Sequence, residues 1–257
     1  MNKHWIFALV SPLLLGACTS GPFKLNQSTH EAPVIDQSGL KPQTSTNFQV
    51  LIFPSGAIKS TYTGNSTVDI SHQVMDSVST TYDRLRGTAD QKPPLQKLDA
   101  AAISSAIAPE LLSVYFATRL ADRLNSCGIQ STVYPNLVNA NNPNWAKQKW
   151  ALPAGFAPDP SQYRFLVEAG VRTIDVQVGL TDKTLQATSY VRVFETNSLK
   201  QIGRYAGSTG ITGSVSLQHL NDTADRRNAE IGRASRQATQ FMVQSLGADM
   251  CSIMTNF

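Results

Sequence analysis

Three consecutive segments, residues 163–180, 185–195 and 199–206, alternate apolar and polar side chains, and they limit the fold more than any other feature. Such alternation is typical of strands with one buried face. In the first segment the apolar positions shift by one residue near Thr173, which predicts a bulge or bend. Because only short turn sequences separate the segments, they predict an antiparallel meander.

Helical spacing of apolar residues appears on both sides of these strands. Residues 109–127 begin with Pro109, a favoured first helical residue, and repeat an apolar side chain every fourth position. Further amphipathic helices are expected over 71–86 and 223–246. The sequence therefore predicts an α+β fold, in which an antiparallel sheet packs against two or three amphipathic helices.

Shorter strands and irregular segments complete the predicted domain. Residues 48–53 form an apolar strand, 57–62 form a candidate partner strand, and 129–134 form a third short strand. Residues 136–161 carry four prolines and form a long irregular insertion. The Gly- and Ser-rich stretch 207–221 is expected to be a mobile loop.

The N-terminus has the order of an export signal. Lys3 precedes an apolar run that is too short to span a bilayer, and the run ends in Leu-Gly-Ala-Cys at Cys18. This ending resembles the lipobox of bacterial lipoproteins. The resemblance implies cleavage before Cys18 and acylation of that residue, with palmitate among the acyl groups. Thr19 in place of Asp implies sorting to the outer membrane of a Gram-negative cell.

The predicted organisation has three parts. Residues 1–17 form a lipoprotein signal peptide, and 18–47 form a lipidated flexible tether rich in Pro, Ser, Thr and Gln. Residues 48–257 form a single periplasmic α+β domain that contains the insertion 136–161. The formal charge of the chain is +4, and no block of like charge indicates a nucleic-acid partner.

Few residues are candidates for catalysis, metal binding or disulfide formation. After cleavage the histidines are His30, His72 and His219, and their spacing matches no zinc motif. We therefore expect no metal, no cofactor and no catalytic residue. Besides Cys18 the mature chain has Cys127 and Cys251, which form either a disulfide in the oxidising periplasm or two separate buried thiols.

Two groups of residues are candidates for partner contact. Trp145 and Trp150 lie in the insertion and suit contact with a partner or a membrane interface, but they equally suit a cap over the core. The second group is a set of arginines near one face of the last helix. They are suited to contact with lipid headgroups or an acidic partner, or they simply face solvent. The group consists of Arg226, Arg233 and Arg236.

The order of elements carries a family resemblance over about residues 108–248. The segments are "FATRLADRL", "TVYP", "YRFLVEAGVRTIDVQVG", "LQATSYVRVFE" and "LKQIGRYAG", followed by the last helix. This order resembles the ABC-transporter auxiliary lipoproteins and is similar to the curli-secretion channel lipoproteins. The resemblance implies a non-enzymatic accessory lipoprotein that contacts an envelope transport or secretion complex.

Two other functions remain open. An envelope hydrolase that acts on glycan or lipid would need Asp175, Glu195 and His219 to converge in a cleft. A subunit of an oligomeric secretion pore would need the segment 163–196 to extend as a membrane hairpin. The oligomeric state does not follow from the sequence.

Overall fold

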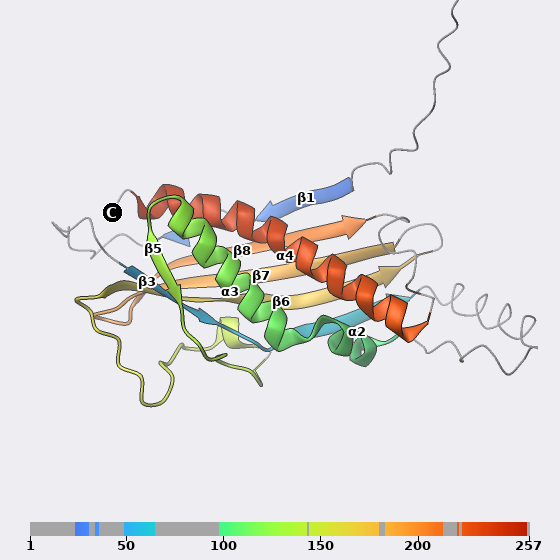
Figure 1. Ribbon diagram of the computed structural model, residues 1–257, viewed down its shortest axis with the longest axis horizontal. Helices are drawn as coiled ribbons and strands as arrows, with labels where there is room; N and C mark the ends of the chain where they lie inside the picture. Colours follow the sequence, from blue (N-terminus) through green and yellow to red (C-terminus); the bar gives the residue numbers. More distant parts are fainter. Residues whose placement is uncertain are drawn as a thin grey trace, which may run out of the picture.

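A sheet is the framework of the described part of the chain (Figure 1). A computed structural model describes residues 24–30, 34–35, 49–64, 98–142, 144–179, 183–212, 220 and 223–255. The strands are β1 (Lys24–His30), β2 (Val34–Ile35), β3 (Gln49–Pro54), β4 (Lys59–Gly64), β5 (Gln130–Val133), β6 (Tyr163–Val178), β7 (Lys183–Glu195) and β8 (Gln201–Thr212). The helices are α2 (Ala100–Ile107), α3 (Pro109–Ser126) and α4 (Ala224–Met254), with a short 3-10 helix η2 (Trp145–Lys147).

The predicted meander forms the centre of the sheet. Strands β6, β7 and β8 pair antiparallel in that order, and β1 and β2 pair antiparallel with β8. Strands β3 and β4 pair parallel with successive halves of β6, and β5 pairs parallel with β3. The α+β fold class is confirmed, and the parallel part is an addition to the predicted antiparallel sheet. It requires a crossover, which α2 and α3 supply between β4 and β5.

A β-bulge divides β6 where the sequence predicts it. The register with β7 shifts between Val171 and Thr173, which leaves Arg172 as the extra residue. The apolar residues before and after the bulge consequently share the core face of the sheet. Close to the bulge, Gly170 is required by crowding, because a Cβ there would collide with the carbonyl oxygen of Ser55.

The helices cover one face of the sheet (Figure 1). Helix α3 begins at Pro109. The apolar side chains at every fourth position, from Leu112 to Leu124, are buried. Helix α4 continues beyond the predicted end at residue 246, because Met250 and Met254 extend its buried stripe. The short helix α2 was not predicted, and Asp99 caps it by accepting a hydrogen bond of 2.8 Å from the backbone N–H of Ala102.

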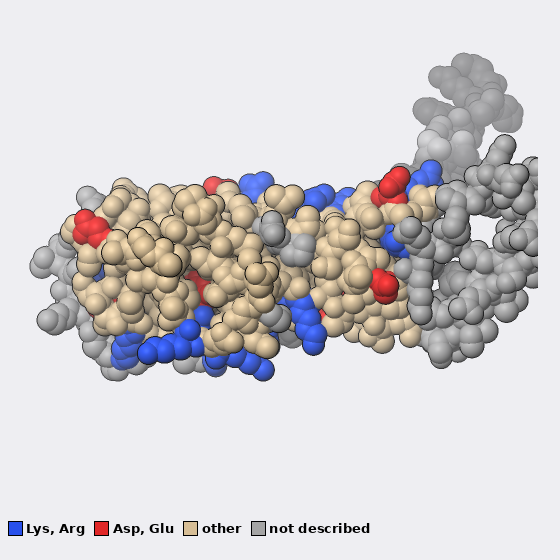
Figure 2. Space-filling view, turned by 90° about the horizontal axis from the view of Figure 1, so that it is seen from below, with Lys and Arg blue, Asp and Glu red and all other residues tan. Residues whose placement is uncertain are grey.

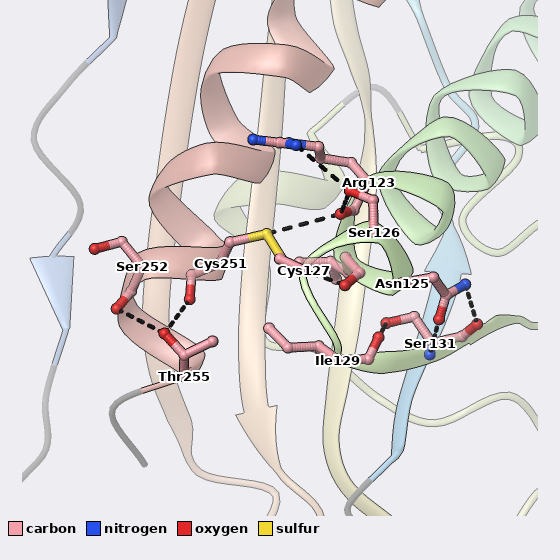
Figure 3. The surroundings of a disulfide bond; sticks show 10 residues. Arg123, Asn125, Ser126, Cys127, Ile129, Ser131, Cys251, Ser252 and Thr255 are labelled. Atoms are coloured by element: carbon pink, nitrogen blue, oxygen red, sulfur yellow. Dashed lines mark hydrogen bonds between the residues drawn. A yellow bond between two sulfur atoms is a disulfide. The ribbon is translucent and has the colours of Figure 1, made fainter.

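A disulfide joins Cys127, just after α3, to Cys251 in the last turns of α4 (Figure 3). The two Cα atoms are 6.1 Å apart. The structure thus forms the first of the two arrangements that the sequence left open. The helices also approach closely one turn earlier, where a Cβ on Gly247 would collide with the side chain of Arg123. The end of α4 is therefore fixed to α3 both by packing and by a covalent bond.

Two predicted irregular segments are partly strands. The expectation of a flexible tether over 18–47 is wrong for β1 and β2, which pair with β8, and the mobile loop over 207–221 is wrong for residues 207–212, which belong to β8. Their sequences carry no apolar alternation that would predict a strand, and the structure pairs their backbones with neighbouring strands. The predicted helix 71–86 and Cys18 lie outside the described residues.

Candidate functional site

A basic groove lies on the face of the sheet opposite the helices. It consists of two adjoining cavities of about 540 and 580 Å³, and both are lined by Ala146, Lys147, Tyr190 and Arg204. Strands β6, β7 and β8 form its floor, and η2 with the following residues forms one wall. Strand alternation explains the floor, because the alternate residues of β7 and β8 point into the core.

Besides Arg192, which pairs with the buried Glu168, four cations line the basic groove. Lys147 and Lys149 come from the insertion, Arg172 from the bulge of β6 and Arg204 from β8. Neither cavity has an Asp or Glu in its lining, and none of the four cations forms an ion pair within the described residues. Figure 2 shows basic side chains gathered along the lower edge of the molecule in that view. The groove is therefore suited to an anionic ligand.

A buried ion pair fastens the insertion beside this groove. The guanidinium of Arg192, on β7, donates to the carboxylate of Glu168, on β6, with an Nε–Oε2 distance of 2.7 Å. The same guanidinium donates to the backbone oxygens of Trp145 and Gln148 in the insertion, at 3.1 and 2.5 Å. Arg192 thereby joins the sheet to the segment that carries Lys147 and Lys149.

Glu168 is completely buried, and its second oxygen is also paired. It accepts hydrogen bonds from Ser55 Oγ at 2.8 Å and from Asn139 Nδ2 at 2.6 Å. Burial raises the pKa of the Glu168 carboxyl, while the charge and hydrogen bonds of Arg192 oppose that rise. Arg192 therefore belongs to the support of the groove, and the exposed cations are the ones available to a ligand.

The two tryptophans of the insertion pack inward. Trp145 is 1% exposed and lies edge-on to Tyr190, with ring centroids 5.9 Å apart. Trp150 is half-buried and stacks on Phe194 at 4.3 Å, beside the buried Phe53. The hypothesis of direct partner contact is wrong for Trp145, and Trp150 mainly covers the apolar half of this sheet face. Both tryptophans therefore agree with the other interpretation of the sequence, in which they cover apolar residues of the domain.

An exposed leucine closes one end of the basic groove. Leu199 lies in the turn between β7 and β8, is 43% exposed and has a φ of 54°. This left-handed conformation is unfavourable for a residue with a Cβ, and an exposed leucine gains little from burial. A residue that is both strained and exposed suggests a contact outside the folded chain.

The predicted arginine group lies elsewhere. Arg226, Arg233 and Arg236 are exposed on α4, which covers the opposite face of the sheet, so they do not line the basic groove. No pattern in the sequence groups Arg172 with Arg204. The bulge near Thr173 was the available signal for Arg172, but the pairing of β7 with β8 is needed to place Arg204 in the same groove.

The carboxylates proposed for a hydrolase do not converge. Asp175 pairs across the sheet with Gln186, whereas Glu195 pairs with Phe165 near the other end of β6. At about 3.3 Å per residue these positions are roughly 30 Å apart. His219 lies outside the described residues, and the part of the chain that is described contains no cluster of three metal-binding side chains.

The hairpin proposed for a secretion pore is part of the domain core. Strands β6 and β7 bury Ile174, Val176 and Leu185 in the main hydrophobic cluster beneath the helices. Within the described ranges no single helix is long and apolar enough to cross a membrane, although α2 and α3 together pass that test across a 48° bend. The hairpin therefore does not extend from the domain in this structure.

Comparisons with known proteins assign no family. No family model matches the chain, and no curated protein matches it. Solved structures that resemble it include a Xanthomonas campestris protein described by the family model DUF330, with 7% identity, a TM-score of 0.37 and coverage of 86% of this chain and 94% of that one. A PelC dodecamer from Paraburkholderia phytofirmans has 10% identity, a TM-score of 0.31 and coverage of 82% and 99%. Lipoprotein GNA1162 from Neisseria meningitidis has 10% identity, a TM-score of 0.24 and coverage of 65% and 83%.

Proposed function

We propose that this chain is a lipid-anchored accessory lipoprotein of a cell-envelope transport or secretion complex, and that it acts by binding rather than by catalysis. The basic groove carries the proposal, because Lys147, Lys149, Arg172 and Arg204 line it without an Asp or Glu and form a surface for an anionic ligand. The lipobox that ends at Cys18 supports attachment to a membrane. Thr19 supports the outer membrane, with the domain in the periplasm.

The test uses the full-length lipoprotein in its own envelope. We expect gently solubilised membranes to contain the protein in a species larger than the protomer on native electrophoresis. The variant Arg204→Glu should reduce that species severalfold, because it places a negative charge in the basic groove. The matched variant Arg236→Glu reverses an exposed charge on α4 and should leave the species unchanged.

Two results would contradict the proposal. Migration of the unmodified lipoprotein as a free protomer would remove the accessory role. Equal effects of Arg204→Glu and Arg236→Glu would show that the basic groove does not contribute to assembly.

A further inference from the structure

We infer that the anionic ligand of the basic groove is the membrane surface itself, so that the domain lies with its open sheet face on anionic phospholipid headgroups. This inference rests on the proposed function and names the ligand of the same groove. Three observations on separate parts of the molecule support it: the distance to the anchor, the leucine at the far end, and the distribution of charge.

The first observation is the short connection between the predicted anchor and the sheet. Lys24, the first residue of β1, pairs with Thr212 at the end of β8. The chain from Cys18 to Lys24 can span at most about 20 Å. A lipid on Cys18 therefore holds this end of the β1–β8 edge close to the bilayer, and β8 is also the strand that contributes Arg204 to the groove.

The second observation is that Leu199 lies at the other end of β8. A strand of this length extends roughly 35 Å, so the anchor and Leu199 are far apart along the sheet. If both touch the bilayer, the long axis of the sheet lies parallel to the membrane. Insertion of Leu199 into the headgroup region would compensate for its exposed, strained conformation, and the neighbouring Lys149 is placed to meet phosphate groups.

The third observation is the contrast in charge between the lining of the groove and the helix face. The groove presents Lys147, Lys149, Arg172 and Arg204 without an acid in its lining. The helix face carries both signs, since Asp122 and Asp225 are exposed on the same helices as the arginines. Each cation close to an anionic lipid surface contributes about fivefold to association, so the groove face is favoured over the helix face.

The experiment places the processed, lipidated protein in vesicles of phosphatidylcholine with or without phosphatidylglycerol. A nitroxide is attached to Asn197→Cys, in the exposed turn beside Leu199, and in a second sample to Gln240→Cys, exposed on α4. We expect bilayer proximity only for position 197 and only with phosphatidylglycerol. High salt should release the domain from the bilayer, because screening weakens interactions between surface charges. Arg204→Glu should shift the docking equilibrium by roughly tenfold or more, and Arg236→Glu should not shift it.

Failure of this inference is distinguishable from failure of the proposed function, because the vesicles contain no protein partner. Absence of bilayer proximity at position 197, with the envelope complex intact, overturns the inference alone. Equal proximity on vesicles without phosphatidylglycerol, or closer approach of position 240, also overturns it. Docking that persists while the envelope complex is absent supports the inference and contradicts the proposed function.

Discussion

At the scale of single residues, the Glu168–Arg192 pair determines whether the insertion stays on the sheet. Both side chains are buried, and Arg192 also holds two backbone oxygens of the insertion. We expect Arg192→Ala to lower the free energy of unfolding by about 3–5 kcal/mol, because it leaves a buried carboxylate without its partner. Chemical denaturation measures this loss.

The pH dependence of that variant provides a second readout. Burial already raises the pKa of Glu168 in the folded state, and removal of the opposing guanidinium raises it further. A folded-state pKa above the unfolded value means that stability is present at low pH and is lost as the pH rises. Arg192→Ala should therefore be less destabilised at about pH 4 than at neutral pH.

The control for this prediction is an exposed ion pair on α3. Arg119 Nη1 lies 3.5 Å from Asp122 Oδ2, and both side chains are more than half exposed. Arg119→Ala should change the free energy of unfolding by less than about 1 kcal/mol. A loss for Arg192→Ala no larger than this, with no dependence on pH, would contradict the assigned role of the buried pair.

Residue-level prediction from the sequence succeeded where a local signal existed. The phase shift near Thr173 located the bulge that presents Arg172. The sequence could not show whether Trp145 is exposed or buried, because its burial depends on contacts with Tyr190 and Arg192 on strand β7. The groove combines residues from three strands and the insertion, so its composition follows only from the sheet register.

At the scale of elements, the disulfide fixes the end of α4 to the end of α3. The bond joins residues separated by 124 positions, and closure of a loop of this length is worth about 4–5 kcal/mol in the chain-entropy model. We expect dithiothreitol to lower the denaturation midpoint of the protein accordingly. The double variant Cys127→Ser with Cys251→Ser should be equally destabilised and insensitive to the reductant. A reductant effect in the double variant would contradict this explanation.

Elements with strong side-chain patterns were predictable, and elements held by backbone pairing were not. The long helices and the meander have apolar repeats that appear directly in the sequence. Strand β1 and the last residues of β8 lack such repeats, and each is stabilised by hydrogen bonds to a neighbouring strand. Parallel pairing of β3 with β6 was also hidden, because it depends on the helical crossover rather than on either strand.

At the scale of the whole molecule, the proposed location of the protein depends on Cys18 and Thr19. We expect Cys18→Ala to abolish metabolic labelling with palmitate. Thr19→Asp should keep the label but retain the protein in the inner membrane, because Asp at this position resembles the retention signal of Gram-negative lipoproteins. Separation of the membranes by density gradient measures the shift. Unchanged outer-membrane recovery of Thr19→Asp would contradict the predicted sorting.

The pairing of β1 with β8 sets an order for the maturation of the protein. Residue 24 meets residue 212, so the first strand of the domain can enter the sheet only after almost the whole chain has been exported. The proposed acylation site, Cys18, lies near the N-terminus and is exported much earlier under this proposal. Under the proposed acylation of Cys18, the sheet is completed on a chain whose beginning is already attached to a membrane, and contacts between such distant segments form slowly. During this interval the unpaired edge of β8 is the region that most needs protection from aggregation.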